Sequence, residues 1–420
     1  MFFRNLPPGS TLAKLKRAVT LSPPARHEMV ALMKEVASDI VDEAESLSLG
    51  GDLWETFLAL RLAQDDNVLG RAAEFNSAPT GSVVTVALPE LWSLQKIVAA
   101  ARSIVDSSAE LDGLRVLKEY ETSRRAKTQP TPALESVSRL AVAFRDAQSA
   151  DEMMSALLGF YASRGAGIFS LHRAFLWSRE SGLLPVKDPD PQTFSSLLGY
   201  RDQKEELLAN TRLFLSGQAA NNVLLYGDSG TGKSSSVKAL LNEPDFIAAG
   251  LRMIEVNKEQ ISEIPGIMRL IGSRGYRFVL FLDDLSFEDY EVEYKHLKAL
   301  IEGGIERKPD NVVIYATSNR RNIVREVWKD RRISSDDVHG WDTMQEKLSL
   351  SDRFGITIWY SSLDKEKYLE IASFYVEKYG IEIPQDEMER LAMRWEIGRG
   401  GFSGRTARQF AQHLLIGRKN

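Results

Sequence analysis

The first part of the chain has the hydrophobic periodicity of helices. Between Arg26 and Leu47, apolar residues recur at spacings of three and four positions, which gathers them on one face of a helix. The segments 88–105 and 134–144 repeat this pattern. Nothing in the region recurs at the period of about 30–45 residues that marks a helical solenoid. We therefore predict a mainly α-helical N-terminal domain over residues 1–180.

A proline-rich stretch separates this region from a different pattern. Three prolines lie among charged residues between 185 and 191, and each proline moves the residue before it away from helical geometry. We interpret residues 181–195 as an extended connector. Beyond it, over 196–360, runs rich in Val, Ile, Leu and Phe alternate with helical segments, as in a parallel sheet with helices on both faces. Residues 361–420 have a helical pattern again.

The composition leaves this picture in place and excludes several classes of protein. Of 420 residues, 43% are hydrophobic and 26% are charged, which suits packed domains rather than a disordered or fibrous chain. The formal net charge of −5 argues against a broad nucleic-acid-binding surface. The absence of cysteine excludes disulfides, thiolate catalysis and cysteine-based metal sites.

The sequence gives no sign of a membrane segment or a secretory signal. No apolar run approaches the roughly 18 residues that a membrane-spanning helix needs. Residues 1–8 lack the charged and then apolar layout of a signal peptide. We therefore expect a cytoplasmic protein with no membrane span.

A glycine-rich loop is the strongest chemical signal. Residues 227–234 match the pattern G-x-x-x-x-G-K-[ST], between an apolar strand-like run at 222–226 and a helical segment at 235–241. Glycines let the backbone turn tightly and direct its N–H groups at phosphate oxygens, and the N-terminus of the helix adds a favourable potential. The alternative interpretation is a glycine turn with a purely structural role.

The loop predicts particular ligands for a nucleoside triphosphate. The Lys233 ammonium would reach the β- and γ-phosphates, and the Ser234 hydroxyl would bind Mg²⁺. The predicted nucleotide-binding residues here are Gly227, Asp228, Ser229, Gly230, Thr231, Gly232, Lys233, Ser234 and Ser235.

A second apolar run, 277–282, ends in two carboxylates. Acids after a strand beside a phosphate loop complete the site of a nucleoside triphosphatase. We predict that Asp283 holds Mg²⁺, directly or through water, and that Asp284 polarises the attacking water as general base. Glu288 is the second candidate for the base. The alternative is that the two aspartates cap the next helix.

Later polar residues fit the same chemistry. Asn319 ends the run 311–319, where its amide can hydrogen-bond the attacking water or the γ-phosphate. Ordinary turn chemistry is the alternative for this segment. Arg405 and Arg408 lie at the start of the last helical segment, from which an arginine can fold back onto phosphate.

Arg353 lies just before the apolar run 356–360. On this connection it can reach the nucleotide of a neighbouring subunit, and its permanent charge can neutralise charge that develops on the γ-phosphate. The alternative is a local ion pair with Asp352 or Glu346.

In this order, the motifs over residues 194–413 resemble those of the AAA+ ATPases. The resemblance implies a P-loop α/β core with a parallel five-stranded sheet and a C-terminal helical lid. It also implies that the segment 199–204, including Gly199 and Tyr200, packs against adenine. ATP and Mg²⁺ are the implied ligands.

The resemblance also assigns roles to the later residues. It implies that Asn319 is the first sensor and Arg353 the arginine finger, while either Arg405 or Arg408 is the second sensor. One departure is Asp284, because many AAA+ proteins have glutamate at that position. Longer stretches are similar to a bacterial family of predicted AAA+ ATPases grouped as a domain of unknown function. These stretches are 221–227, 282–288, 315–321 and 348–355.

Together, the motifs and the resemblance predict Mg²⁺-dependent ATP hydrolysis in a homo-oligomeric ring or partial ring. We expect hydrolysis to remodel a macromolecular partner that the N-terminal domain selects. One alternative is a loader or scaffold that hydrolyses ATP slowly and changes partners with its nucleotide state. A weaker alternative is a small-molecule kinase, which leaves Asn319, Arg353 and the helical lid unexplained.

A cluster of basic residues also suggests nucleic-acid binding. Arg320, Arg321, Arg325, Lys329, Arg331 and Arg332 lie within thirteen positions. Such a cluster makes salt-sensitive phosphate contacts. However, no aromatic stacking platform interleaves with the basic residues, and Asp336 and Asp337 follow. We therefore favour a solvated or intersubunit surface.

Overall fold

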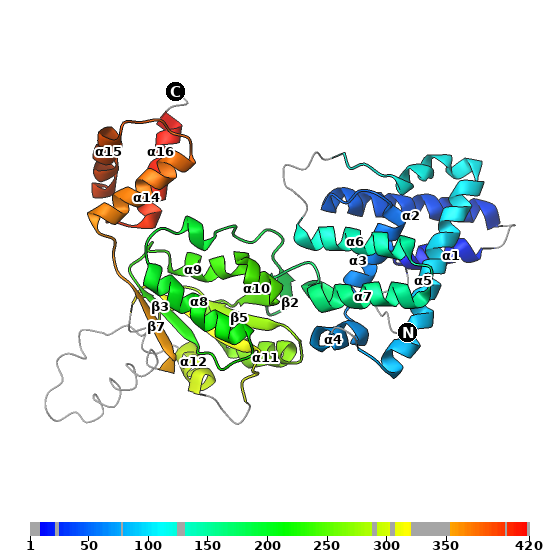
Figure 1. The fold of residues 1–420 in the computed structure, drawn as a ribbon, viewed down its shortest axis with the longest axis horizontal. Coiled ribbons are helices and arrows are strands. Elements are labelled where there is room, and N and C mark those ends of the chain that lie inside the picture. Colours follow the sequence, from blue (N-terminus) through cyan, green and yellow to red (C-terminus); the bar gives the residue numbers. More distant parts are fainter. Residues whose placement is uncertain are drawn as a thin grey trace. The chain divides into compact units, whose positions relative to one another are not determined.

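The chain forms two compact units, Met1–His172 and Arg173–Asn420. The computed structural model describes residues 9–21, 25–76, 79–123, 131–287, 292–302, 307–320, 353–399 and 401–417 (Figure 1). Each unit buries a hydrophobic core of its own.

The first unit is helical, as the periodicity predicts. Its helices are α1 (Thr11–Thr20), α2 (Arg26–Leu47), α3 (Leu53–Ala63), α4 (Val68–Phe75), α5 (Ser82–Ser107), the 3₁₀ helix η2 (Ala109–Lys118), α6 (Pro132–Asp146), α7 (Ala150–Arg164) and the 3₁₀ helix η3 (Gly167–Phe169). Almost every residue of α3 is buried, including Trp54, and α2, α5 and α6 pack against it. Asp52 begins α3 by accepting hydrogen bonds from the backbone N–H groups of its first turn.

Among the described residues, one helix has the length and apolar composition of a membrane-spanning segment. It is α5, in which isolated polar residues interrupt the apolar ones. Its residues Ala87, Leu91, Val98 and Val105 are fully buried and recur along one face that belongs to the helical core. This face accounts for part of the composition, since 22% of the most apolar 18-residue window of α5 is buried.

The second unit is built on a seven-stranded sheet. Its strands are β1 (Ala174–Ser178), β2 (Gly182–Pro185), β3 (Val223–Gly227), β4 (Leu251–Glu255), β5 (Arg277–Leu282), β6 (Val312–Ser318) and β7 (Ile356–Tyr360). They lie in the order β2-β1-β4-β5-β6-β3-β7, and all neighbours are parallel except β1 and β2. Strands β3 to β7 form the predicted parallel core.

The predicted number of five strands is two too low. Residues 174–185, which the sequence pattern divides between a helical domain and a connector, form the hairpin β1–β2, and this hairpin extends the sheet beside β4. Two such short strands show little periodicity, and Pro185 argues against a strand at this point. Pro185 is tolerated because β2 lies at the edge of the sheet.

Helices cover the sheet and form the lid. The helices of this unit are η4 (Phe194–Ser196), α8 (Arg201–Leu215), α9 (Lys233–Ala239), η5 (Leu240–Asn242), α10 (Pro244–Ala248), η6 (Lys258–Glu263), α11 (Ile264–Gly272), α12 (Val292–Glu302), α14 (Lys365–Lys378), α15 (Gln385–Ile397) and α16 (Gly404–Gly417). Leu207 and Phe214 of α8 and Val237 of α9 share one core cluster with β3, β5 and β6. Helices α14, α15 and α16 form the predicted C-terminal lid and bury a separate cluster, including Tyr368 and Phe410 (Figure 1).

The order of the strands brings the sequence motifs to one edge of the sheet. Strands β5, β6 and β3 are direct neighbours and run parallel. Their carboxyl ends lead into the Asp283–Asp284 pair, Asn319 and the phosphate loop, respectively. Ligand sites in open parallel sheets lie beyond this edge.

Candidate active site

The phosphate loop begins where β3 ends, at a position that requires glycine. Gly227 has a φ of +135°, and a Cβ atom there would lie 1.9 Å from the backbone oxygen of Tyr360 in the neighbouring strand β7. The oxygen belongs to the backbone and the backbone fixes the position of the Cβ, so no side-chain rotation relieves the overlap. Gly230 and Gly232 also have positive φ, +79° and +97°, in the tight turn that precedes α9.

We expect Gly227→Ala to lower the free energy of unfolding of the second unit by about 1–3 kcal/mol, because overpacking and backbone strain act together. Denaturant unfolding of the full chain measures the change. Gly266→Ala is the matched control, since Gly266 lies in α11 and a Cβ there meets no atom within 4 Å. Equal stability of the two variants would contradict the steric account.

Lys233 is held at the start of α9 by the loop itself. Its Nζ donates to the backbone oxygens of Gly227 at 2.7 Å and Asp228 at 2.6 Å, and to Asn319 Oδ1 at 3.1 Å. Burial lowers the pKa of Lys233, while the nearby carboxylates, Asp284 foremost, oppose this shift. The ammonium is therefore enclosed at the end of the sheet where phosphates would bind.

Ser234 and Asp283 form a close oxygen pair. Ser234 Oγ donates to Asp283 Oδ1 at 2.6 Å, and Thr317 Oγ1 donates to the same oxygen at 2.6 Å. On the other side of the carboxylate, Lys238 Nζ lies 3.8 Å from Asp283 Oδ2. A hydroxyl and a carboxylate are hard oxygen ligands of the kind Mg²⁺ takes together with phosphates and waters, so these residues fit the implied metal.

Asp284 and Asn319 face each other across the ends of β5 and β6. Asn319 Nδ2 donates to Asp284 Oδ1 at 2.6 Å, and the Asp284 backbone N–H donates to Thr317 Oγ1 at 2.8 Å. Asp284 has a φ of +52°, a left-handed conformation that aspartate and asparagine tolerate better than most residues. Its carboxylate is exposed at the site. The backbone geometry therefore gives a physical reason for aspartate at this position.

A cleft of about 450 Å³ extends from the phosphate loop to the lid. Gly199 and Tyr200 line its other end, together with Leu198, Ile371 and Tyr375. Tyr200 is held firmly: its ring packs against that of Tyr360 with centroids 4.8 Å apart, and its hydroxyl donates to the Ser361 backbone oxygen at 2.5 Å. The cleft thus joins a polar end, at the loop, to an end with apolar walls.

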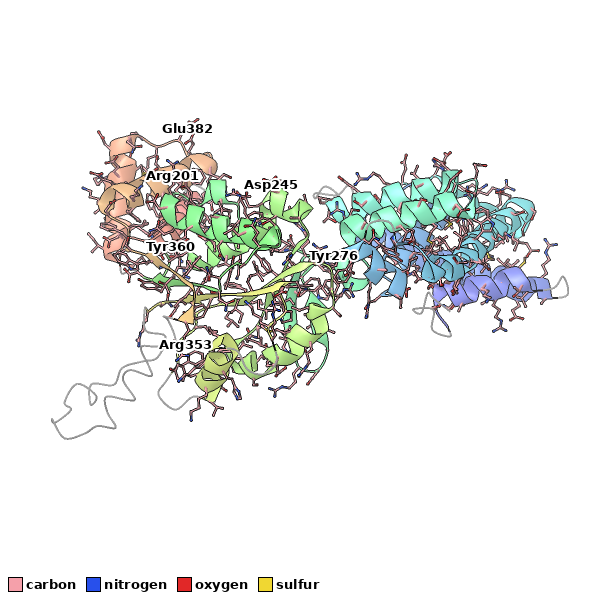
Figure 2. All side chains as sticks on the ribbon, turned by 60° about the horizontal axis from the view of Figure 1, so that its bottom comes forward. Arg201, Asp245, Tyr276, Arg353, Tyr360 and Glu382 are labelled. Carbon is pink, nitrogen blue, oxygen red and sulfur yellow. The ribbon has the colours of Figure 1, made fainter. Side chains whose placement is uncertain are left out.

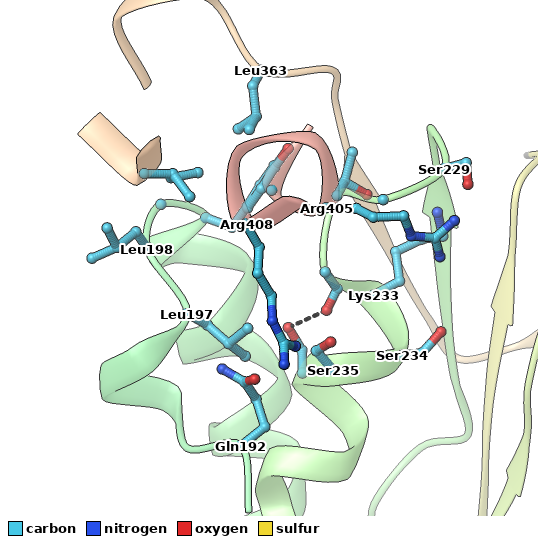
Figure 3. Close-up of a pocket in the computed structure, with 18 of the residues that line it drawn as sticks. Gln192, Leu197, Leu198, Ser229, Lys233, Ser234, Ser235, Leu363, Arg405 and Arg408 are labelled. Carbon is cyan, nitrogen blue, oxygen red and sulfur yellow. Dashed lines mark hydrogen bonds between the residues drawn. The ribbon is translucent and has the colours of Figure 1, made fainter. Parts of the chain in front are cut away.

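The two lid arginines reach different parts of this cleft. The Arg405 backbone N–H lies 3.4 Å from the Gly230 backbone oxygen, and its charge contributes to lowering the pKa of Lys233. Figure 3 shows Arg405 beside Lys233, whereas Arg408 extends past Ser235 toward Gln192. The two arginines, which the sequence cannot tell apart, are therefore separated in space.

Arg353 does not line the cleft of its own chain. It precedes β7, and Figure 2 shows it at the opposite end of that strand from Tyr360. Because β7 runs parallel to β3 and Tyr360 pairs with Gly227, Arg353 lies at the amino edge of the sheet, on the order of 20 Å from the phosphate loop at 3.3 Å per residue. Glu288 and residues 321–352, which include most of the basic cluster, lie outside the described residues.

The structure also reveals polar residues that the motifs do not single out. Thr317 hydrogen-bonds both Asp283 and the backbone of Asp284, and Lys238 lies between Asp283 and Glu255, 3.8 Å from each carboxylate. Thr317 belongs to the run of small polar residues that ends β6, and this run is recognisable in the sequence. Nothing in the sequence points to Lys238, because its partners come from two other strands.

The fold and the site together define a P-loop protein with the fold of the AAA+ class, as the motifs predict. Within this class, the chain belongs to the family described as "Protein of unknown function (DUF815)", whose model matches residues 170–418. A comparison with curated proteins gives no match.

Solved structures with a similar fold are distant. The RuvB Holliday junction branch migration motor of Thermotoga maritima is 18% identical, with a TM-score of 0.38 over 54% of this chain and 65% of the RuvB chain. The chain thus spans slightly less than two thirds of RuvB. The FIGL-1 AAA domain in complex with ADP is 15% identical, with a TM-score of 0.36 over 55% of this chain and 74% of that domain.

Proposed function

We propose that this chain binds Mg·ATP and hydrolyses it, as an oligomeric cytoplasmic ATPase that remodels a macromolecular partner. The observation that carries the proposal is a continuous hydrogen-bonded group at the carboxyl ends of three adjacent strands. In it, Ser234 contacts Asp283, and Thr317 links Asp283 to the backbone of Asp284. Asn319 then joins Asp284 to Lys233. Each of these types of residue has a distinct task in phosphoryl transfer.

The residues divide these tasks by position. The N–H groups of the loop and the Lys233 ammonium bind the phosphates. Lys233 contacts the β- and γ-phosphate oxygens. Asp284 accepts a proton from the attacking water, and the Asn319 amide orients Asp284 and that water. Ser234 and Asp283 would hold Mg²⁺, which neutralises phosphate charge when bound.

We assign Arg405 as the second sensor. Its position beside Lys233 supports contact with the phosphates, whereas Arg408 extends toward the other end of the cleft (Figure 3). The close approach of Gly230 and the lid supports this arrangement, because a Cβ on Gly230 would lie 2.9 Å from Ser403 Oγ and 3.2 Å from Arg405 Cβ. A lid in this position contacts the phosphate loop directly, so a nucleotide bound to the loop acts on the position of the lid.

We expect Lys233→Ala to weaken ATP binding by about tenfold or more, since a hydrogen bond from a charged group is worth about 1.5–3 kcal/mol. Calorimetric titration of the full chain with Mg·ATP measures the affinity. Lys365→Ala, on an exposed position of α14 away from the cleft, should bind ATP as the unmodified chain does. Unchanged affinity in a well-folded Lys233→Ala protein would remove Lys233 from the site.

A slow nucleotide-controlled loader or scaffold is the second candidate, and Asp284 favours it. The aspartate side chain is one methylene shorter than the glutamate found in many AAA+ proteins. The left-handed backbone at position 284 also disfavours glutamate there. Steady-state turnover separates the two functions, because a remodelling enzyme turns over continuously and a loader does so slowly.

Capture of bound proteins by an ATP-trapped Asp284→Asn variant, with and without the helical unit, tests whether that unit selects the partner.

A further inference from the structure

We infer that Gln192 selects the base of the nucleotide by accepting a hydrogen bond from an amino group, as adenine offers at position 6. The inference rests on the proposed nucleotide site and adds the choice of base. Gln192 precedes α8 in the chain and lines the same cleft as the phosphate loop. Figure 3 shows its side chain near the tip of Arg408 and away from Lys233. This is the end of the cleft beyond the phosphates.

Hydrogen bonds determine which end of the Gln192 amide is available. Ser196 Oγ donates its one proton to the Thr193 backbone oxygen at 2.8 Å, so it acts as an acceptor toward Gln192. The 2.6 Å contact between the two side chains is therefore a hydrogen bond from Gln192 Nε2 to Ser196 Oγ. The amide oxygen, Oε1, has no hydrogen-bond partner among the described residues. An acceptor with a defined orientation thus remains for a ligand.

The backbone around Gln192 is held in place by two polar side chains. Asp190 Oδ1 accepts the Gln192 backbone N–H at 3.1 Å. Asn242, the last residue of η5, donates through Nδ2 to the Gln192 and Asp190 backbone oxygens at 2.7 and 2.8 Å. A group already fixed in its bound position loses little conformational freedom when a ligand arrives. Gln192 is therefore suited to discriminate between ligands.

The surroundings favour a flat base with an amino edge. Leu197, which lines the cleft and lies between Leu198 and Gln192 in Figure 3, gives this part of the cleft an apolar wall. The Leu197 backbone oxygen already accepts a hydrogen bond from Lys204, and among the described side chains at this end Gln192 carries the only amide. Adenine presents an N6 amino group to an acceptor, whereas guanine and hypoxanthine present the oxygen O6. If O6 of the base faced Gln192 Oε1, two acceptors would meet and neither oxygen would have a hydrogen-bond donor, which weakens binding.

The test compares ATP with ITP, whose base carries an oxygen in place of the amino group. Affinities of both are measured with the full chain by competition against a fluorescent nucleotide. We expect the unmodified chain to prefer ATP by at least about tenfold, and Gln192→Leu to lose about tenfold in ATP affinity with ITP binding unchanged. Gln218→Leu is the matched control, because Gln218 is exposed between α8 and β3 and does not line the cleft.

A second variant guards against misfolding of the first. Ser196→Ala removes the acceptor that orients the amide, so the amide can turn and the ratio of ATP to ITP affinity should fall while both still bind. A ratio that stays unchanged in both variants overturns the inference, as does equal binding of ATP and ITP by the unmodified chain. If the unmodified chain binds neither nucleotide, the proposed function itself fails, so the two failures are distinguishable.

Discussion

Asp284→Asn is expected to bind Mg·ATP normally and to hydrolyse it about 10²–10⁴-fold more slowly, the usual contribution of a general base. Asparagine keeps the shape of the side chain, an oxygen for Asn319 Nδ2 and tolerance of the left-handed φ of +52°. It loses the negative charge and, with it, the capacity to accept a proton from water. Single-turnover hydrolysis and calorimetric binding, measured on the same preparation, should therefore separate chemistry from affinity.

Asp386→Asn serves as the control, because Asp386 lies exposed in the first turn of α15 and outside the cleft. It should hydrolyse ATP at the rate of the unmodified chain. Glu288→Gln tests the second candidate for the base. An intact single-turnover rate in Asp284→Asn, together with a lost rate in Glu288→Gln, would transfer the role of base to Glu288.

Arg353→Ala is expected to lower the rate of hydrolysis by about 10³–10⁵-fold with much less effect on ATP binding, as removal of an arginine finger does in other phosphoryl-transfer systems. The position of Arg353 at the amino edge of the sheet places it far from the phosphate loop of its own chain. Its planar guanidinium suits a γ-phosphate oxygen of a neighbouring subunit. Steady-state hydrolysis, with binding measured in parallel, checks the expectation, and Arg390→Ala on exposed α15 is the matched control.

Mixing two inactive proteins tests whether Arg353 acts between subunits. Arg353→Ala protein supplies intact phosphate loops, and Lys233→Ala protein supplies intact fingers. Their mixture should regain measurable hydrolysis at shared interfaces. Co-assembly without any recovery would instead favour the local ion pair of Arg353 with Asp352 or Glu346.

The chemically informative residues of this chain are predictable because they belong to local patterns. The phosphate loop occupies eight consecutive residues, 227–234, and both flanking elements are visible as a strand-like run and a helix. Asp283 and Asn319 follow apolar runs that form parallel strands, and the carboxyl ends of such strands share one edge. Their convergence, with Asn319 bonded to both Lys233 and Asp284, follows from that rule.

The sequence by itself predicted the helical first unit, the parallel α/β core, the helical C-terminal segment and the phosphate-loop and acidic motifs, because periodicity and contiguous motifs are local properties. Tertiary structure decided what depends on packing between distant segments. It added the hairpin β1–β2 to the sheet, placed Lys238 between Asp283 and Glu255, and separated Arg405 from Arg408. These contacts join residues far apart in the chain, and their geometry is set by how the strands and helices pack rather than by any spacing along the sequence.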